Sequence, residues 1–313
     1  MQWLEITIRT NADSIDAVAG ALTAGGFADL VLEDQAEFSD FLDQNRAYWD
    51  YIDEELQKKL EGLSQIKLYL EDTDTAGLDR LRELTEAREL RMDVAAMAET
   101  NWEESWKDNY PPVSVGEKLI VLPYWLENPE AERLPVILDP GLTFGTGAHP
   151  STQMVMEFME HLVAPGSRCL DLGSGSGILS IAALRLGASA AVGVDIDPKA
   201  EDIARENAAY NGFAAPAFTA MTGNVTEDKD LMDALSRESW DVVLVNIVAD
   251  VIIGLAPVLP AFVGSESTLI CSGILDSRLT DVTAALEKAG FAVTEIRAKE
   301  DWRSITAKRR IAL

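Results

Sequence analysis

The first hundred residues consist of short segments in which apolar and polar positions alternate or recur at helical spacing. Residues 2–9 and 65–72 alternate as half-buried strands do, and residues 75–90 have the apolar spacing of a helix face. The expected elements are strand 2–9, helix 11–25, strand 28–34, strand 65–72, helix 75–90 and strand 91–99. This order predicts a small ferredoxin-like α+β domain over residues 1–100. An acidic, aromatic insertion at residues 36–62 separates its second and third strands.

From Arg168 onward, continuous apolar runs replace the alternating segments. The expected strands are residues 168–173, 190–197, 215–223, 240–247 and 267–274, with two more inside 291–310. The expected helices between them are residues 177–187, 198–212, 248–263 and 277–290. Strands that are apolar throughout are typical of a parallel sheet covered by helices on both faces, so this part of the chain is predicted to be an α/β domain.

An aromatic segment lies between these two patterns. Residues 101–125 contain three tryptophans, two tyrosines and a Pro-Pro pair. We place the linker and domain junction here and assign residues 126–313 to the second domain; the run EKLIVLP, residues 117–123, is expected to be a strand that opens the second unit. A length of 313 residues suits two domains.

The net charge of the chain indicates which kinds of macromolecule it can bind. It has 53 Asp and Glu against 26 Lys and Arg, a formal net charge of −27. Such a chain repels phosphate backbones and attracts basic proteins, so we expect no direct nucleic-acid recognition. Acidity that serves solubility alone is the alternative interpretation.

The cysteine and hydropathy patterns indicate the cellular compartment in which the protein is expected. Cys169 and Cys271 lie in apolar runs without the spacing of a metal site, so we expect two buried thiols and no metal. The first ten residues lack a basic segment followed by an apolar one, and no apolar run reaches about 18 residues. We expect a cytoplasmic protein without a membrane span.

The first apolar run of the α/β domain ends in a glycine-rich loop, DLGSGSG, at residues 171–177. Its glycines, Gly173, Gly175 and Gly177, let a ligand approach the backbone, and the next helix offers unpaired N–H groups at its start. Dinucleotide-binding loops use the spacing G-x-G-x-x-G, which differs from the G-x-G-x-G found here. A tight turn that binds nothing is the alternative.

An acidic residue at the end of the second strand of the α/β domain indicates which ligand the glycine-rich loop binds. Asp195 can accept hydrogen bonds from two ribose hydroxyls, and with the loop it is typical of class I S-adenosylmethionine methyltransferases. For Asp197, a helix N-cap followed by Pro198 is the favoured role. Asn224, after the third strand, is either near an adenine or a simple turn residue.

Asn246 ends the fourth strand, where a parallel-sheet enzyme would place its substrate. Enzymes that methylate nucleobases or glutamine often have Asn-Pro-Pro-Tyr here, and the tyrosine stacks on a planar group. This chain continues Ile247-Val248-Ala249 instead. The loss of the ring favours a flexible aliphatic amine over a flat base or amide.

Seven segments resemble the ribosomal protein L11 methyltransferases, the PrmA-type enzymes. They are NWEESWKDNYPPVSVGEKLIVLPYW, LDPGLTFGTGAHPSTQ, CLDLGSGSGILSIAALRLGA, GVDIDPKA, VNIVA, CSGIL and WRSI. The second and fifth are the most specific. Together they extend over most of residues 101–310, whereas the first third of the chain matches in layout more than in residues.

The resemblance implies a Rossmann-like class I methyltransferase domain, with a mostly parallel seven-stranded sheet, preceded by a small ferredoxin-like domain that captures the substrate. It also implies an enzyme that uses S-adenosyl-L-methionine to trimethylate α-amino and lysine ε-amino groups of ribosomal protein L11. The cofactor contacts carried over from the family are Thr152, Gly173, Asp195 and Asn246, and the glycine loop adds Gly175. We expect a monomer.

Asn246 and Thr152 are the expected catalytic residues. Methyl transfer from a sulfonium depends mainly on positioning, because the leaving group is already excellent. Both side chains can accept hydrogen bonds from a neutral amine and orient its lone pair. His149 has two interpretations, a general base or a residue that stabilises its loop.

A second glycine-rich segment, residues 138–153, lies upstream of the first Rossmann-type strand and cannot be its strand–helix turn. We interpret it as a lid and wall of the site. Phe144 would be an apolar cover, and Thr152, at the start of a helix, a polar contact. Closure would exclude water around the sulfonium.

Three other functions remain open. The first is methylation of amines in a different protein, and the second is methylation of amino groups on nucleobases, as in rRNA. The third is a non-catalytic adaptor role in which the first domain binds a basic protein. The charge of −27 and the missing ring disfavour the second. The intact cofactor motifs disfavour the third.

Overall fold

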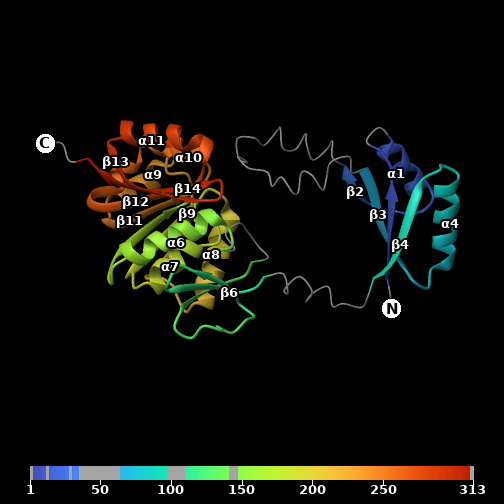
Figure 1. Cartoon of the computed structure of the whole chain (residues 1–313), viewed down its shortest axis with the longest axis horizontal. Coiled ribbons are helices and arrows are strands. Elements are labelled where there is room, and N and C mark those ends of the chain that lie inside the picture. The colour runs from blue at the N-terminus through green and yellow to red at the C-terminus, as the bar shows by residue number, and fades with distance from the viewer. Residues whose placement is uncertain are drawn as a thin grey trace. The chain divides into compact units, whose positions relative to one another are not determined.

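The computed structural model describes residues 3–11, 14–27, 30–34, 64–97, 110–140 and 147–310. The chain divides into two compact units, residues 1–109 and 110–313 (Figure 1). The insertion at 36–62 and the lid residue Phe144 both lie outside the described residues.

The first unit is a four-stranded antiparallel sheet with two helices on one face (Figure 1). Its elements are β1 (Trp3–Arg9), α1 (Ile15–Ala24), β2 (Val31–Asp34), β3 (Ser64–Glu71), α4 (Thr75–Glu86) and β4 (Arg91–Met97). The strand order is β2-β3-β1-β4. This is the predicted ferredoxin-like arrangement, and the prediction is confirmed.

The alternating pattern of β1 and β3 decides which face of this sheet is buried. Ile6 pairs with Leu68 and Ile8 with Ile66, and all four side chains are buried in one cluster with residues of α1 and α4. Because side chains of a strand alternate between faces, the residues between them point away from the helices. The core of the first unit therefore lies between the sheet and its two helices.

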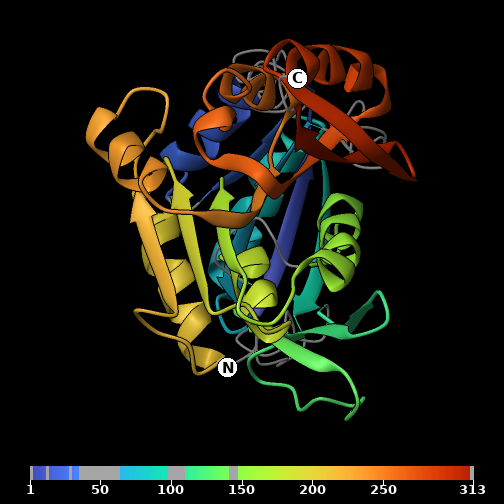
Figure 2. The ribbon, with the colours of Figure 1, turned by 90° about the vertical axis from the view of Figure 1, so that its left-hand side faces the viewer.

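The second unit is built around a seven-stranded sheet in the order β10-β9-β8-β11-β12-β14-β13. Its strands are β8 (Arg168–Leu172), β9 (Ala190–Asp195), β10 (Phe218–Thr222), β11 (Trp240–Asn246), β12 (Val263–Leu275), β13 (Phe291–Lys299) and β14 (Trp302–Arg309). β8 to β12 pair in parallel, as the arrowheads of β8, β9 and β10 show in Figure 2, and β14 is antiparallel to both β12 and β13. The predicted mostly parallel sheet is confirmed.

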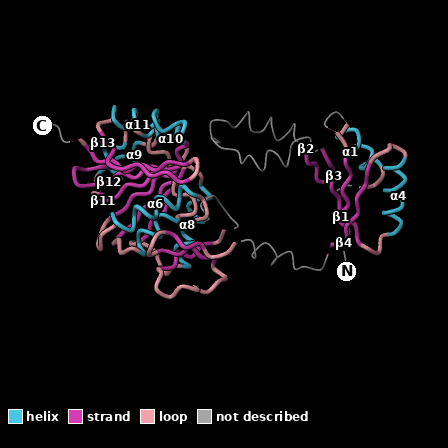
Figure 3. Tube along the Cα trace, in the orientation of Figure 1, coloured by secondary structure: helices cyan, strands magenta, loops and turns pink. Residues whose placement is uncertain are grey.

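Helices cover both faces of the large sheet, so the strands form the middle layer (Figure 3). They are α6 (Pro150–Leu162), α7 (Ile178–Arg185), α8 (Pro198–Tyr210), α9 (Lys229–Ser236), α10 (Ala249–Leu255) and α11 (Leu279–Lys288). One core cluster joins α6, α7 and α8 to the sheet through residues such as Phe158 and Ala204, and a second joins α9, α10 and α11 through residues such as Leu231 and Ile252. Within the described ranges, none of the helices has the length and apolar character needed to cross a membrane.

The helix expected over residues 248–263 is the clearest local error of the sequence prediction. The helix α10 ends at Leu255, and a short 3-10 turn, Leu259–Ala261, follows it. Pro257 and Pro260 explain the break, because proline cannot continue a helix. The pattern also missed α9, which is only eight residues long, although its buried Leu231 and Leu235 lie one helical turn apart.

A separate three-stranded sheet opens the second unit. It contains β5 (Val113–Val115), β6 (Leu119–Pro123) and β7 (Leu134–Leu138), with β6 parallel to β7 and antiparallel to β5. Every residue of β6 is buried, and Leu119 and Val121 join the core beside α6 and α7. The second unit thus begins at Tyr110, inside the segment that the sequence assigned to the linker and earlier than the predicted boundary at residue 126.

Candidate active site

The carboxyl ends of the central strands meet at one edge of the large sheet. Leu172 of β8 pairs with Val194 of β9 and with Val245 of β11, and Asn246 of β11 pairs with Ser272 of β12. Ligands of open α/β sheets bind outside this edge. The expected cofactor and catalytic residues that follow these strands therefore lie in one region.

The loop after β8 has a backbone that glycine adopts far more readily than other residues. Gly173, Gly175 and Gly177 have φ angles of +79°, +49° and +77°. A Cβ at position 173 would also lie 2.4 Å from Cγ2 of Ile247. The N–H of Gly173 donates to the carbonyl of Val194 at 2.8 Å, which ties the loop to β9. The loop is thus held close to β11 and β9 before it enters α7.

Asp195 joins this loop from the end of β9. Its Oδ2 accepts a hydrogen bond from the N–H of Gly175 at 2.9 Å, and its Oδ1 accepts one from the N–H of Asp197 at 3.0 Å. The next side chain, Ile196, is 66% exposed although it is large and apolar. A carboxylate beside an exposed apolar side chain suits a nucleoside, with its polar ribose and flat base. The sequence prediction missed Ile196, whose only signal is an apolar residue between two acids at a strand end.

Asp171 is a second residue that the sequence prediction missed. It lies two residues before Gly173, and its side chain is only 1% exposed. Its Oδ2 accepts a hydrogen bond from the hydroxyl of Ser180 at 2.9 Å, whereas Oδ1 has no partner among the described residues. Burial raises the pKa of Asp171 to about 7; the Ser180 hydrogen bond opposes this shift, and the charge of Asp195 adds to it. An unpartnered buried acceptor here suits a positively charged ligand.

The two expected catalytic side chains contact each other. Nδ2 of Asn246 donates to Oγ1 of Thr152 at 3.3 Å, across a sequence separation of 94 residues. Thr152 is buried and Asn246 is half-buried. Because the amide nitrogen is the donor in this contact, Oδ1 is the atom of Asn246 that can accept a hydrogen bond from a substrate.

His149 holds the start of the helix that carries Thr152. Its Nδ1 accepts a hydrogen bond from the N–H of Ser151 at 3.2 Å and lies 2.7 Å from the hydroxyl of the same residue, so His149 is the N-cap of α6. Its ring also meets that of Trp302 edge-on, with centroids 4.6 Å apart. Burial lowers the pKa of His149, and the charge of Glu300 opposes this shift. These contacts favour the loop-stabilising interpretation over a general base.

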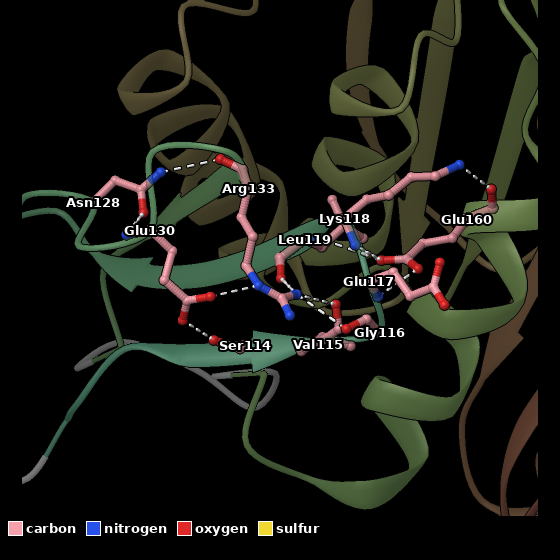
Figure 4. Close-up of polar contacts among 10 residues, drawn as sticks. All are labelled: Ser114, Val115, Gly116, Glu117, Lys118, Leu119, Asn128, Glu130, Arg133 and Glu160. Carbon is pink, nitrogen blue, oxygen red and sulfur yellow. Dashed lines mark hydrogen bonds and ion pairs between the residues drawn. The ribbon is translucent and has the colours of Figure 1, made fainter.

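The other end of α6 is anchored by a buried carboxylate (Figure 4). Glu160 accepts hydrogen bonds from the N–H groups of Glu117, Lys118 and Leu119 at 2.8, 2.7 and 3.1 Å, in the turn before β6 and at the first residue of β6. Arg133 donates to carbonyls around the same turn, including that of Leu119 at 3.0 Å. The small sheet thus holds α6 in place, a role that the sequence pattern did not indicate.

Two asparagines, Asn207 in α8 and Asn211 at its C-cap, hold β7 and the residue after it. Oδ1 of Asn207 accepts from the N–H of Asp139 at 2.9 Å, while its Nδ2 donates to the carbonyl of Ser176 in the glycine loop at 2.8 Å. One turn later, Asn211 accepts from the N–H of Ile137 at 2.9 Å and donates to its carbonyl at 2.7 Å. Asn207 therefore connects the glycine loop to the start of the second glycine-rich segment.

The chemistry available at the sheet edge follows from its side chains. In the described part of the chain, no group of three or more His, Cys, Asp or Glu is placed to hold a metal ion. Cys169 and Cys271 are buried free thiols, and burial raises the pKa of each to about 12. The side chains at the edge can bind by hydrogen bonds and charge, and Asn246 and Thr152 carry no titrating group. The arrangement suits a reaction that depends on positioning.

Comparison with known proteins gives concordant matches. The family model described as "Ribosomal protein L11 methyltransferase (PrmA)" matches residues 2–310. A ribosomal protein L11 methyltransferase of Heliobacterium modesticaldum is 36% identical over 321 residues, covering 99% of this chain and 98% of that protein. A protein of the same name from Caldanaerobacter subterraneus subsp. tengcongensis is 33% identical, covering 99% of this chain and 100% of that protein.

A solved structure agrees with these sequence matches. It is the crystal structure of a ribosomal protein L11 methylase from Lactobacillus delbrueckii subsp. bulgaricus, which is 29% identical to this chain. The match has a TM-score of 0.58 and covers 64% of this chain and 100% of that one. Sequence and backbone comparisons therefore point to the same family.

Proposed function

The chain belongs to the ribosomal protein L11 methyltransferase family, and from this premise we propose that it trimethylates the α-amino group and lysine ε-amino groups of ribosomal protein L11. It is a methyltransferase whose cofactor is S-adenosyl-L-methionine. The observation that carries the proposal for amine chemistry is the contact between Asn246 and Thr152 at the carboxyl edge of the sheet.

When bound, S-adenosyl-L-methionine supplies a methyl group on a positively charged sulfur. The residues present suit such a ligand, because Asp195 can accept hydrogen bonds from ribose hydroxyls and the unpartnered Oδ1 of Asp171 can compensate a positive charge. We assign cofactor binding to Gly173, Gly175, Asp195, Thr152 and Asn246. Asp171 and Ile196 extend this set. The glycines bring the backbone close to the ligand, and the carboxylates provide polarity and charge.

The attacking amine must be neutral. A free lysine has a pKa of about 10.4 and an α-amine one of about 7.7–8.0, so each must lose a proton first. Desolvation at the site lowers the pKa of an amine. We assign Oδ1 of Asn246 and Oγ1 of Thr152 as acceptors that hold the N–H groups of the neutral primary and monomethylated amine and aim the lone pair at the methyl group. Water takes the proton, because neither side chain titrates.

An aliphatic amine fits this site better than a nucleobase does. After Asn246 the chain continues Ile247-Val248-Ala249, which offers no ring to stack on a planar group. The net charge of −27 repels RNA and attracts a basic protein. Amines of a different basic protein are the alternative substrate, and amino groups of rRNA are the weaker one.

Selection of the protein target is assigned to the first unit. All of the residues assigned above belong to the second unit, so the ferredoxin-like unit is not needed to hold the cofactor. We propose that it captures the substrate and that the enzyme works as a cytoplasmic monomer. An interaction between an acidic protein and a basic substrate weakens as salt screens the charges.

Transfer of label from S-adenosyl-L-methionine tests these proposals. The enzyme is incubated with purified ribosomal protein L11, with the other ribosomal proteins, and with bare rRNA, and the products are analysed by mass spectrometry. Trimethylated amines in L11 support the proposal, whereas label in another protein supports the alternative substrate. Label in rRNA, or no label in any sample, contradicts amine methylation of a ribosomal protein. The variant Asn246→Ala serves as the control for transfer at this site.

A further inference from the structure

We propose that Ser272 is a positioning residue, which sets the separation between Asn246 and Thr152 without touching the substrate. The inference rests on the proposed role of this pair in amine methylation. Ser272 lies in the segment CSGIL, for which neither the cofactor motifs nor the catalytic pair provide a role. Its side chain is completely buried, with an exposure of 0%.

The backbone of Ser272 holds the chain at Asn246. Ser272 is the residue of β12 that pairs with Asn246 of β11. Its carbonyl accepts a hydrogen bond from the N–H of Ile247 at 3.2 Å. The direction in which β11 leaves the sheet, and with it the placement of the Asn246 amide, therefore depends on Ser272.

The side chain of Ser272 holds the other member of the pair. Its Oγ donates to the carbonyl of Ser151 at 3.0 Å, across 121 residues of sequence. Ser151 directly precedes Thr152 in the first turn of α6, and both are buried. Ser272 thus bonds to the residue after Asn246 and to the residue before Thr152.

A bulge in β12 allows this arrangement. The pairing of β12 with β14 shifts in register between Cys271 and Ile274. Between them, Gly273 has a φ angle of +79°, and a Cβ there would lie 2.5 Å from the carbonyl oxygen of Ile247. Bulges re-aim side chains and recur beside active sites. Here the bulge lets the backbone of Ile247 approach β12, and Ser272 lies within the same bulge.

Removal of the hydroxyl should loosen α6 against β12, and with it Thr152 against Asn246, without opening the core. The carbonyl of Ser151 lies in the first turn of α6, so the helix itself does not depend on Ser272. A misplacement of about 1 Å in a positioned site can lower the rate about 100-fold. For the loss of one hydrogen bond behind the pair, we expect Ser272→Ala to lower kcat about 10-fold while the affinity for S-adenosyl-L-methionine stays within about twofold.

Ser267 offers a matched control on the same strand. Its hydroxyl is also buried and donates to a backbone carbonyl, that of Trp240 at the start of β11, far from the carboxyl edge. Ser267→Ala therefore removes the same type of hydrogen bond at the opposite end of β11, together with one that the hydroxyl accepts from the N–H of Gly264 at 2.9 Å. We expect it to lower the thermal unfolding temperature at least as much as Ser272→Ala does and to leave kcat unchanged.

The decisive experiment measures single-turnover methylation and cofactor affinity for Ser272→Ala, Ser272→Cys, Ser267→Ala, Asn246→Ala and the double variant Ser272→Ala/Asn246→Ala. If Ser272 acts through the pair, its substitution has little further effect once Asn246 is gone. Ser272→Cys keeps most of the volume with a weaker donor, so it gives an answer even where Ser272→Ala fails to fold, and we expect an intermediate rate.

Three results would overturn the inference: a full rate in both Ser272 variants, an equal rate loss in Ser267→Ala, or an undiminished effect of Ser272→Ala in the Asn246→Ala background. Failure of the proposed function looks different. In that case the wild-type enzyme transfers no label to ribosomal protein, or Asn246→Ala retains the full rate whatever the Ser272 variants do.

Discussion

The proposed site has two ends, one for the cofactor and one for the acceptor amine, which are built in different ways. At the cofactor end, the loop at Gly173 and Gly175 meets Asp195 across only 20 residues of sequence, and most of the contacts involve backbone groups. At the acceptor end, Asn246 meets Thr152 across 94 residues, and the contact is between two side chains. Ser272 adds a further long-range bond behind the pair.

This difference predicts which kinetic quantity a substitution at each end will change. The cofactor end is built mostly from backbone groups, so few of its side chains can be shortened and larger ones do not fit. A substitution there should lower the affinity for the cofactor. A side-chain end can be truncated without disturbing the fold, so its damage should appear in kcat. The two ends adjoin at Ile247, whose side chain lies against the position where a Cβ of residue 173 would be.

The largest effect is expected for Gly173→Ala. The positive φ of +79° strains any residue with a Cβ, and the added atom would lie 2.4 Å from Ile247. Binding of S-adenosyl-L-methionine, measured by calorimetry, should fall below detection. The matched control is Gly166→Ala, because Gly166 has a φ of +88° but no atom within 4 Å of the position that a Cβ would take. It should lose about 1–2 kcal/mol of stability from backbone strain and still bind the cofactor; equal binding loss in both variants would refute the steric explanation.

Asn246→Ala should show the next largest effect, at the acceptor end. Without Oδ1 the amine loses one of its two acceptors, and we expect kcat to fall about 100-fold. The affinity for the cofactor should change much less. Adding Thr152→Val to this variant should cost little more, because the two side chains act together. A full rate in Asn246→Ala with intact cofactor binding would remove Asn246 from the mechanism.

Asp195→Asn tests the cofactor end without changing its shape. Loss of a charged acceptor costs about 1.5–3 kcal/mol, so the dissociation constant for S-adenosyl-L-methionine should rise about 10- to 100-fold. At saturating cofactor, kcat should stay close to wild type. Asp197→Asn is the control, because the side chain of Asp197 accepts from the N–H of Lys199 as the cap of α8. A loss of kcat with unchanged affinity in Asp195→Asn would break the division between the two ends.

Asp171 should make cofactor affinity depend on pH. Burial raises its pKa to about 7, so in the free protein its stabilising contribution is complete below the unfolded pKa of about 3.9 and is lost as pH rises through 7. A positively charged ligand favours the carboxylate, so affinity should rise about tenfold between about pH 6 and pH 8. Titration calorimetry across this range measures the effect, and Asp171→Asn should abolish it. An unchanged slope in that variant would assign the pH dependence to another group.

His149 should show the smallest effect, on stability. Its Nδ1 caps α6 only when unprotonated, and burial lowers its pKa. Its contribution is therefore complete above the unfolded pKa of about 6.5 and is lost as pH falls through the lower folded pKa. His149→Ala should cost about 1 kcal/mol in chemical unfolding at pH 8, and His149→Asn should restore much of it as an alternative cap. If His149 were the general base, His149→Asn would change the pH–rate profile; we expect the profile to stay the same.

The fold could be predicted largely from local patterns. Ile6 and Ile8 alternate with polar residues, which indicates a sheet buried on one face in the first unit. The continuous apolar runs of β8 and β11 indicate a sheet buried on both faces in the second unit. Errors arose at short elements and at helix ends. α9 is only eight residues long, and the helix expected over residues 248–263 was extended through two prolines. In the small sheet, the strand expected over residues 117–123 is confirmed as β6, whereas its partner strands β5 and β7 were not predicted.

The residues of the candidate site also differ in how far the sequence alone could identify them. The glycine spacing and Asp195 could be found from the sequence, because each follows directly from a strand end. Asp171, Ile196 and Ser272 could not, because an acid in an apolar strand, an exposed isoleucine and a strand serine have no distinctive spacing. Their significance comes from burial, exposure and hydrogen-bond partners.

By itself, the sequence determined most of the order of elements, the glycine loop and the acid at the end of β9, since these depend on interactions between near neighbours in the chain. Only the tertiary structure decided that Asn246 contacts Thr152, that the carbonyl of Ser151 accepts a hydrogen bond from Ser272, and that Asp171 has a buried oxygen without a partner among the described residues. The physical reason is that these contacts join strands and helices far apart in the chain, and their geometry depends on how the whole sheet packs.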